Sequence, residues 1–291
     1  MSEYCMGEMI KRTRKMQNMS QEELAFGICS VSTLSRIENG LETPARATFE
    51  KMIERLGGIK GQTSCDTAED EAYRCRYLAV RNVIRSKKEM NDSLMDEYGS
   101  LGRNDTFLNY IEAVDSFDDN DINGCISLLM PILGAKGVKP DLSKIDYVLF
   151  EPYEVHAFIL LSNCYREKGE YAKSGKILVR LKKYLEESFN FGEIYGELYI
   201  VLLTEYADLS VKKGAAAEGI AFCSLALNEI ECRGKTFLKK KVFDIKAVAY
   251  EAAGKRELGH EYRNYVKVLT DLIKGCSEER NRPVEVAMFN F

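Results

Sequence analysis

The chain has 291 residues, of which 45% are hydrophobic and 30% are charged, and its formal net charge is −4. This composition excludes a disordered chain, and the length is enough for one large or two ordinary globular domains. The acidic balance excludes a generally basic nucleic-acid coat, so any contact with nucleic acid must come from a local patch.

Cysteine and histidine usage argues against a disulfide framework and a zinc site. The nine cysteines are scattered without a Cys-x-x-Cys pair, and only two histidines occur. We therefore expect reduced thiols, no metal and no cofactor. Apolar runs such as "YIVLL" at 199–203 are far too short to span a membrane, and the pattern of a signal peptide is missing. We expect a cytoplasmic protein without membrane contact.

Apolar residues recur at spacings of three and four along most of the chain, which predicts an all-α protein. We predict an N-terminal domain of five helices over residues 1–62, a linker helix over 63–90 and a larger helical domain over 91–291. The boundary falls near the Gly-, Ser- and Thr-rich stretch "GGIKGQTSCDT", residues 57–67, which has no helical periodicity.

The basic segment "KRTRK", residues 11–15, lies in the first predicted helix and places four cations in five residues. These side chains are either the solvated face of that helix or a patch for sequence-independent phosphate contacts. We expect two of the four cations to make such contacts: the four are Lys11, Arg12, Arg14 and Lys15.

Start and stop signals delimit the next helices. Ser20 followed by Glu23 forms a capping box at the start of the second helix, and Asn39 and Gly40 end the third. Pro44 stands near the first turn of the helix after that. The residues predicted to face inward are Leu24, Ile28, Leu34, Ile37, Phe49, Met52, Ile53 and Leu56.

The third helix and the turn before it present several small hydroxyls on their outer side: Ser30, Ser32, Thr33 and Ser35, together with Arg36. Solvated helix faces usually carry Lys and Glu, whereas a helix that enters the DNA major groove has little room for long side chains. Ser and Thr reach base edges or phosphates at short range, and Arg binds a guanine or a phosphate. The alternative is a small helical fold with an adapter role.

Three features of the N-terminal domain, "SQEEL" (20–24), "LSRIENG" (34–40) and Pro44, resemble the helix-turn-helix of Cro/C1-type repressors and occur in the same order. The resemblance implies that this domain binds DNA, with Gln21 on a phosphate and Arg36 on DNA. The alternatives are a place in the helix cap for Gln21 and an ion pair with Glu38 or Glu42 for Arg36. The predicted DNA-binding residues are Arg14, Lys15, Gln21, Ser30, Ser32, Thr33, Ser35 and Arg36.

The segment between these motifs, "AFGICSVST", is one residue shorter than in the common repressor pattern. This shorter turn is similar to that of the Gram-positive peptide-sensing regulators of the Rgg/PlcR type, the RRNPP family. The resemblance implies a C-terminal tetratricopeptide-like domain that binds a short signalling peptide.

An internal repeat supports that architecture. "FILLSNCYREKGEY" at 158–171 is echoed by "FDIKAVAYEAAGKR" at 243–256, and more weakly over 203–219 and 109–133. Each strong copy has an aromatic residue, a small residue and a glycine. This pattern suits a helical hairpin whose two helices approach closely at the small residue and whose turn contains the glycine. The pattern resembles the tetratricopeptide repeat and predicts an α-solenoid, with ordinary helical hairpins as the alternative.

A stack of hairpins curls, and the first helix of each hairpin lines its concave side. The predicted concave positions are His156, Ile159, Asn163, Arg166, Thr204, Asp208 and Lys212. An Asn amide donates to and accepts from an extended peptide backbone, and Arg or Lys binds a carboxylate. The residues alone indicate a mixed polar groove, and the peptide ligand is what the resemblance implies.

Catalytic motifs are missing from the sequence, so we predict that the protein is not an enzyme. The acidic stretch "DSFDDNDING" at 115–124 lacks the closing Glu of a calcium loop and is predicted to be a hairpin turn. We predict a homodimeric transcription regulator that binds double-stranded DNA at a two-fold operator and is gated by a short peptide, as in quorum sensing. The alternative is a regulator whose repeats only dimerise or dock a protein partner.

Overall fold

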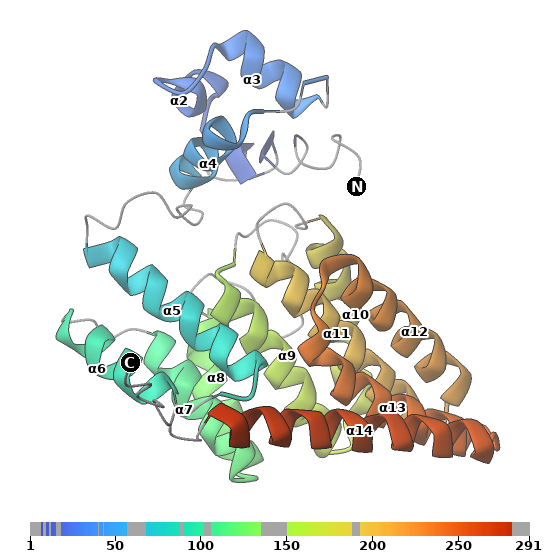
Figure 1. Ribbon diagram of the computed structural model, residues 1–291. Coiled ribbons are helices and arrows are strands. Elements are labelled where there is room, and N and C mark those ends of the chain that lie inside the picture. The colour runs from blue at the N-terminus through green and yellow to red at the C-terminus, as the bar shows by residue number, and fades with distance from the viewer. Residues whose placement is uncertain are drawn as a thin grey trace, which may run out of the picture.

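The computed structural model describes residues 7, 10–11, 13–15, 19–39, 41–42, 44–56, 68–87, 90–101, 106–134, 150–187 and 193–280. These residues are helical apart from turns and short connections, which confirms the all-α prediction (Figure 1). They form two hydrophobic cores, one in the N-terminal helices and one in the larger helical domain. None of the described helices is both long and apolar enough to cross a membrane.

The N-terminal domain contains α2 (Gln21–Ala25), α3 (Val31–Glu38) and α4 (Arg46–Arg55), preceded by helical residues between 7 and 15. A fifth helix, predicted before residue 62, is not among the described residues of this range. The core contains the residues predicted to face inward, fully buried or nearly so at Leu24, Leu34, Ile37, Met52, Ile53 and Leu56. Ile28 and Phe49 pack against it partly buried.

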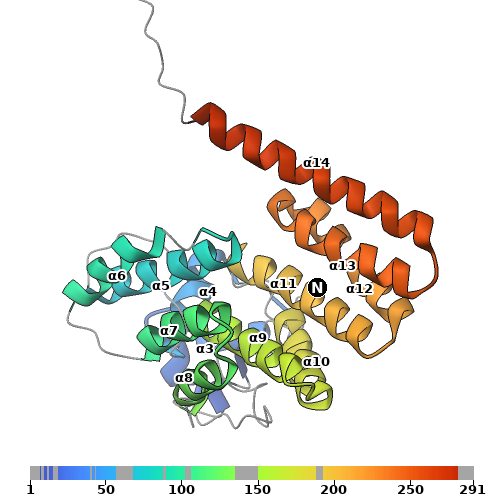
Figure 2. The same cartoon turned by 90° about the horizontal axis from the view of Figure 1, so that it is seen from below.

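The larger domain begins with α5 (Ala68–Ile84) and α6 (Asn91–Ser100). Helical hairpins follow: α7 (Thr106–Asp118) with α8 (Ile122–Gly134), α9 (Pro152–Glu167) with α10 (Tyr171–Glu187), α11 (Glu193–Lys212) with α12 (Ala216–Arg233), and α13 (Lys239–Ala252) with α14 (Arg256–Arg280). A 3₁₀ turn, η4 (Thr236–Leu238), precedes α13. Figure 2 shows the hairpins following one another as a stack that ends at α14, as the predicted repeat architecture requires.

The turns of these hairpins lie at the glycines of the predicted repeat. Gly169, Gly214 and Gly254 have φ angles of +75°, +81° and +77°, which residues with a Cβ rarely adopt. The acidic stretch at 115–124 contains the predicted turn, residues 119–121 between α7 and α8, and Asn120 has a φ of +62° there. Asn is the residue other than glycine that best tolerates this conformation.

Small residues lie where paired helices approach. The Oγ atoms of Ser162 and Ser174 are 2.8 Å apart, between α9 and α10. A Cβ added to Gly219 would lie 3.1 Å from the carbonyl oxygen of Ala207, so α11 and α12 meet almost backbone to backbone. The small positions of the repeat therefore determine how closely the helices of each hairpin pack.

The predicted linker helix is part of the larger domain. α5 contacts α6, α9 and α11, and it buries four residues in the core of that domain: Ala72, Cys75, Ala79 and Val80. Burial of these side chains keeps the apolar face of α5 out of water. Residues 57–67, where the domain boundary was predicted, lie outside the described residues.

Candidate DNA-binding head and ligand cavity

The helix-turn-helix begins with the predicted capping box. The Ser20 Oγ accepts from the Glu23 backbone N–H at 3.1 Å, and the Glu23 carboxylate accepts from the Ser20 N–H at 2.6 Å. These hydrogen bonds lower the pKa of Glu23. They satisfy two backbone donors that the first turn of α2 would otherwise leave open.

Small hydroxyls gather at the start of α3, and we call Ser30, Ser32, Thr33 and Ser35 the hydroxyl surface. Ser30 is the N-cap of α3, and its Oγ accepts from the Thr33 N–H at 3.0 Å. The same Oγ lies 2.8 Å from the hydroxyl oxygens of Ser32 and Thr33. Ser30 and Ser32 are exposed, whereas Thr33 and Ser35 are half-buried. The hydroxyls of Ser30, Ser32 and Thr33 therefore form a connected group at the exposed start of α3, a suitable surface for DNA.

Arg14 is buried in the head and paired with Glu38, so it is not placed to contact a phosphate as predicted. Its guanidinium donates to Glu38 from Nε at 2.7 Å and from Nη2 at 2.9 Å, and Nη1 donates to the Met19 carbonyl at 2.8 Å. Both side chains are buried, with exposed fractions of 7% and 2%. A phosphate could reach Arg14 only by displacing Glu38 from the core.

The other predicted DNA contacts differ in their surroundings. Lys15 is exposed, and Arg12 lies outside the described residues. Gln21 is half-buried and donates to Glu38 at 2.8 Å instead of capping α2. Arg36 is exposed and lies 3.2 Å from the Glu42 carboxylate, the ion pair weighed as an alternative. Because exposed pairs are weak, Arg36 can exchange Glu42 for a phosphate.

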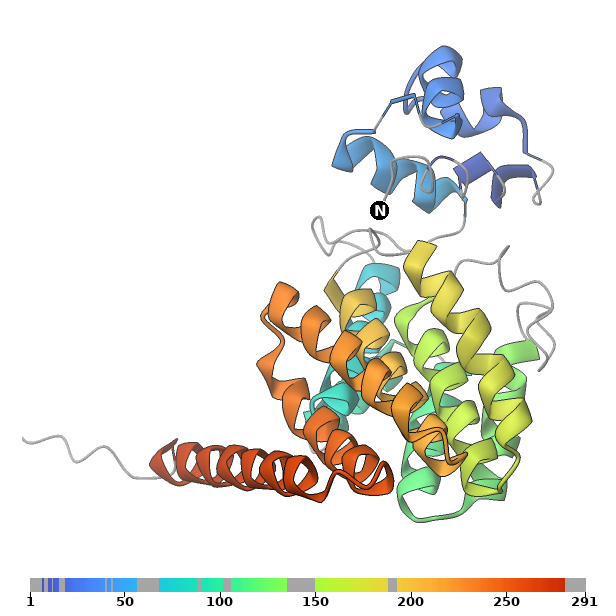
Figure 3. The ribbon, with the colours of Figure 1, turned by 90° about the vertical axis from the view of Figure 1, so that its right-hand side faces the viewer.

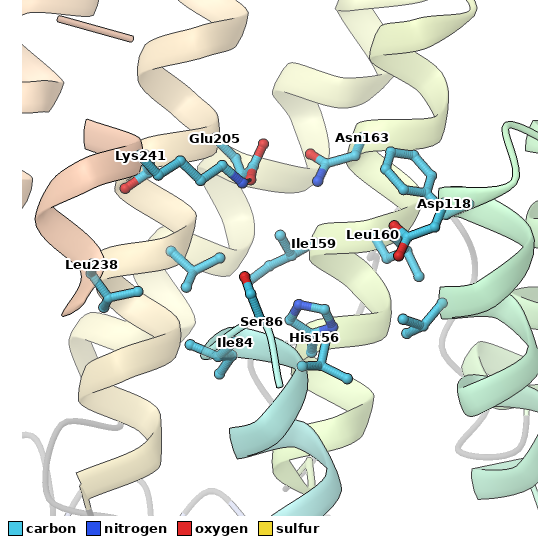
Figure 4. Close-up of a pocket in the computed structure, with 15 residues that line it drawn as sticks. Ile84, Ser86, Asp118, His156, Ile159, Leu160, Asn163, Glu205, Leu238 and Lys241 are labelled. Carbon is cyan, nitrogen blue, oxygen red and sulfur yellow. Dashed lines mark hydrogen bonds and ion pairs between the residues drawn. The ribbon is translucent and has the colours of Figure 1, made fainter. Parts of the chain in front are cut away.

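A cavity of about 450 Å³ lies in the larger domain between α5, α7, α9, α11 and the segment from η4 to α13 (Figure 4). Its apolar wall includes Ile84, Ile159 and Leu238. Its polar lining residues are Ser86, Asp118, His156, Asn163, Thr204, Glu205 and Lys241. The volume lies within the range of ligand sites, and the lining is mixed, with seven polar residues among fifteen.

The predicted concave residues divide between the cavity and a neighbouring ion-pair cluster. His156, Ile159, Asn163 and Thr204 line the cavity. Arg166, Asp208 and Lys212 do not: Arg166 lies 2.7 Å from Glu205 and 3.1 Å from Asp208, and Lys212 lies 2.8 Å from Glu167. These three residues therefore join α9 to α11. The sequence prediction missed Ser86, Asp118, Glu205 and Lys241.

Asn163 has an unsatisfied carbonyl in the wall of the cavity. The side chain is 8% exposed, and its Oδ1 has no hydrogen-bond partner among the described residues. His156 has a partner, because its Nδ1 lies 3.0 Å from the Tyr110 hydroxyl, and Thr204 donates to the Ile200 carbonyl at 2.7 Å. Burying a polar atom without a hydrogen bond costs about 1–3 kcal/mol, so Asn163 favours a ligand that donates to it.

Glu205 carries a buried charge at the edge of the cavity. Burial alone would raise the pKa of its carboxyl, but the charges of Lys241 and Arg166 and their hydrogen bonds lower that pKa to about 2. The carboxylate is therefore ionised at neutral pH and joins α11 to α9 through Arg166 and to α13 through Lys241. Within the described residues, no group of three His, Cys, Asp or Glu is placed to hold a metal ion.

Residues 10–60 match the family described as helix-turn-helix. This match agrees with the capped α2, the turn and the hydroxyl surface of α3, and it identifies the head as a helix-turn-helix DNA-binding domain. The N-terminal part of the protein is thus a helix-turn-helix domain, and it is followed by a helical repeat domain.

The chain is similar in fold to PlcR from Bacillus thuringiensis, solved in complex with the peptide PapR7 and DNA, with a TM-score of 0.52 at 13% identity over 96% of this chain and 100% of PlcR. ComR from Streptococcus vestibularis, in complex with its cognate signaling peptide XIP, matches with a TM-score of 0.47 at 16% identity over 94% of both chains. The apo form of ComR from S. thermophilus matches with a TM-score of 0.46 at 18% identity over 96% of this chain and 100% of ComR. No curated protein sequence matches the chain.

Proposed function

We propose that the protein is a cytoplasmic transcription regulator that binds a two-fold operator as a homodimer and is gated by a short peptide in the cavity. The hydroxyl surface supports the proposed DNA contact, since small hydroxyls and a helix N-terminus suit base edges and phosphates. The proposed DNA-binding residues are Lys15, Gln21, Ser30, Ser32, Thr33, Ser35 and Arg36. Arg14 supports the head from within instead.

The last helix supports the proposed dimer. Leu258, Tyr265 and Leu272 follow one another at intervals of seven on α14 and are 38%, 43% and 59% exposed. Figures 2 and 3 show the C-terminal half of α14 extending beyond the other helices. A solenoid needs a polar cap at its end, so this apolar stripe favours pairing with a second copy.

Sedimentation equilibrium should find a dimer at micromolar concentration, and Leu272→Glu should shift it toward monomer because a charge would enter the apolar contact. Lys255→Glu, at an exposed position just before α14, is the control and should leave the dimer intact. A monomer at micromolar concentration, both free and with operator, would rule the dimer out.

The proposal of a peptide ligand rests on one observation, the unsatisfied Oδ1 of Asn163 in the cavity wall. An extended peptide presents alternating N–H and C=O groups, so one carboxamide can both accept from and donate to it. The cavity is small for a peptide of about five to ten residues, so we expect one end of the peptide to enter it and the rest to lie outside it. The similarity in fold to PlcR, which was solved with the peptide PapR7, supports this ligand class.

Asn163→Ala should weaken peptide binding about tenfold, since a buried hydrogen-bonding partner is lost. The peptide is first selected from a synthetic library of five to ten residues, and calorimetry then measures its affinity for both proteins. Asn228→Ala, an exposed position on α12, is the matched control and should bind like the wild type.

The same titration with and without operator DNA tests the gate. By thermodynamic reciprocity, operator should change the affinity for the peptide by the factor with which the peptide changes DNA affinity. Equal affinities in both titrations would leave a peptide-binding protein without a switch. A library from which nothing is selected would favour the alternative, in which the repeats only dimerise or dock a protein.

A further inference from the structure

An apolar side chain lies exposed within the hydroxyl surface. Val31, the first residue of α3, is 39% exposed and stands between Ser30 and Ser32 in the chain. One turn further on, Leu34 is fully buried in the core of the head. Val31 is therefore not part of the apolar stripe by which α3 packs into the core. The methyl groups of Val31 are available for contact with a molecule that binds at the start of the helix.

The hydroxyls around Val31 are already hydrogen-bonded in the free head. The Ser30 Oγ accepts from the Thr33 N–H at 3.0 Å and lies 2.8 Å from the hydroxyls of both Ser32 and Thr33. These hydrogen bonds use part of the donor and acceptor capacity of the hydroxyls, whereas Val31 has no polar group and gives up no hydrogen bond. An apolar contact at this place loses nothing on the protein side.

The N-terminal residues of the second helix of a helix-turn-helix contact base edges in the major groove. Base edges there present hydrogen-bond donors and acceptors, and their apolar feature is the C5-methyl group of thymine. We propose that Val31 packs against a thymine methyl in each half-site and is a specificity-determining residue. The proposal rests on the DNA-binding function of the head.

Replacement of thymine by 2′-deoxyuridine removes only that methyl group and tests the contact directly. Duplexes are selected from a random pool with the full-length protein, and each thymine of the selected operator is then replaced in turn. For the wild type, one replacement in each half-site should weaken binding about fourfold, the effect of exposing one methyl-sized group. Val31→Ala should bind thymine and uracil operators equally at that position.

Val248→Ala is the matched control, since this valine is 42% exposed on α13 in the larger domain, and it should keep the wild-type preference. Thermal unfolding checks that Val31→Ala is folded. If no uracil replacement weakens the wild type, or if one weakens Val31→Ala by the same factor, the Val31 contact is refuted while DNA binding stands. If no sequence is enriched from the pool, the DNA-binding function fails, and the contact fails with it.

Discussion

Glu38→Ala should unfold the DNA-binding head and leave the larger domain folded. Glu38 holds the Arg14 guanidinium through two hydrogen bonds, at 2.7 and 2.9 Å, and accepts a third from Gln21 at 2.8 Å. Its removal leaves the buried charge of Arg14 with the Met19 carbonyl but without its carboxylate partner, and the loss of one partner of a buried ion pair destabilises a fold by about 3–5 kcal/mol. A head of this size has little stability to lose beyond that amount.

Limited proteolysis of the full chain, followed by mass spectrometry, measures this effect on each domain separately. Fragments of the head should appear at protease concentrations that leave the wild-type head intact, while the repeat domain resists equally in both proteins. Glu22→Ala, an exposed glutamate on α2, should digest like the wild type. A Glu38→Ala head as resistant as the control would show that Arg14 does not depend on Glu38.

The features of the head that the sequence predicted are local. The capping box joins residues three apart, and the end of α3 at Asn39 follows from its own dipeptide signal. The pair of Arg14 and Glu38 joins residues 24 apart, whereas the sequence predicted a place on the surface for Arg14. A signal was nevertheless present, because Arg14 stands four residues after the buried Ile10 and Glu38 four after Leu34. Each charge thus lies on an apolar stripe.

The sequence could predict which residues of a single helix line the cavity, but not which residues other hairpins of the stack contribute. Spacings of three and four correctly place His156, Ile159 and Asn163 on one face of α9, because helix geometry alone determines that face. The same spacing adds Arg166, which instead turns to Glu205 on α11. Lys241 comes from a later hairpin, and its approach to the cavity depends on how successive hairpins stack, which no local pattern encodes.

Glu205→Gln should lower the stability of the repeat domain by about 3 kcal/mol at pH 7, because the pKa of Glu205 lies near 2 in the folded state against an ordinary 4.5. The folded domain binds fewer protons than the unfolded chain between these two values. The contribution of Glu205 is therefore complete above pH 4.5 and is lost as the pH falls toward 2. Arg166, itself buried, would keep the carboxylates of Asp208 at 3.1 Å and Glu167 at 3.5 Å.

Urea unfolding of the full chain, followed by the helical signal between pH 7 and pH 3, separates charge from packing. The difference in unfolding free energy between wild type and Glu205→Gln should be largest at pH 7 and shrink toward pH 3, because the Glu205 carboxyl of the unfolded chain takes up a proton near pH 4.5 while the folded one stays ionised. Glu112→Gln, exposed on α7, should change stability by less than about 0.5 kcal/mol at every pH. A difference that stayed constant across this range would trace the loss to the altered shape of the side chain. The ion pairs of Glu205 with Arg166 and Lys241 would then contribute no net stability, as continuum estimates find for many buried pairs.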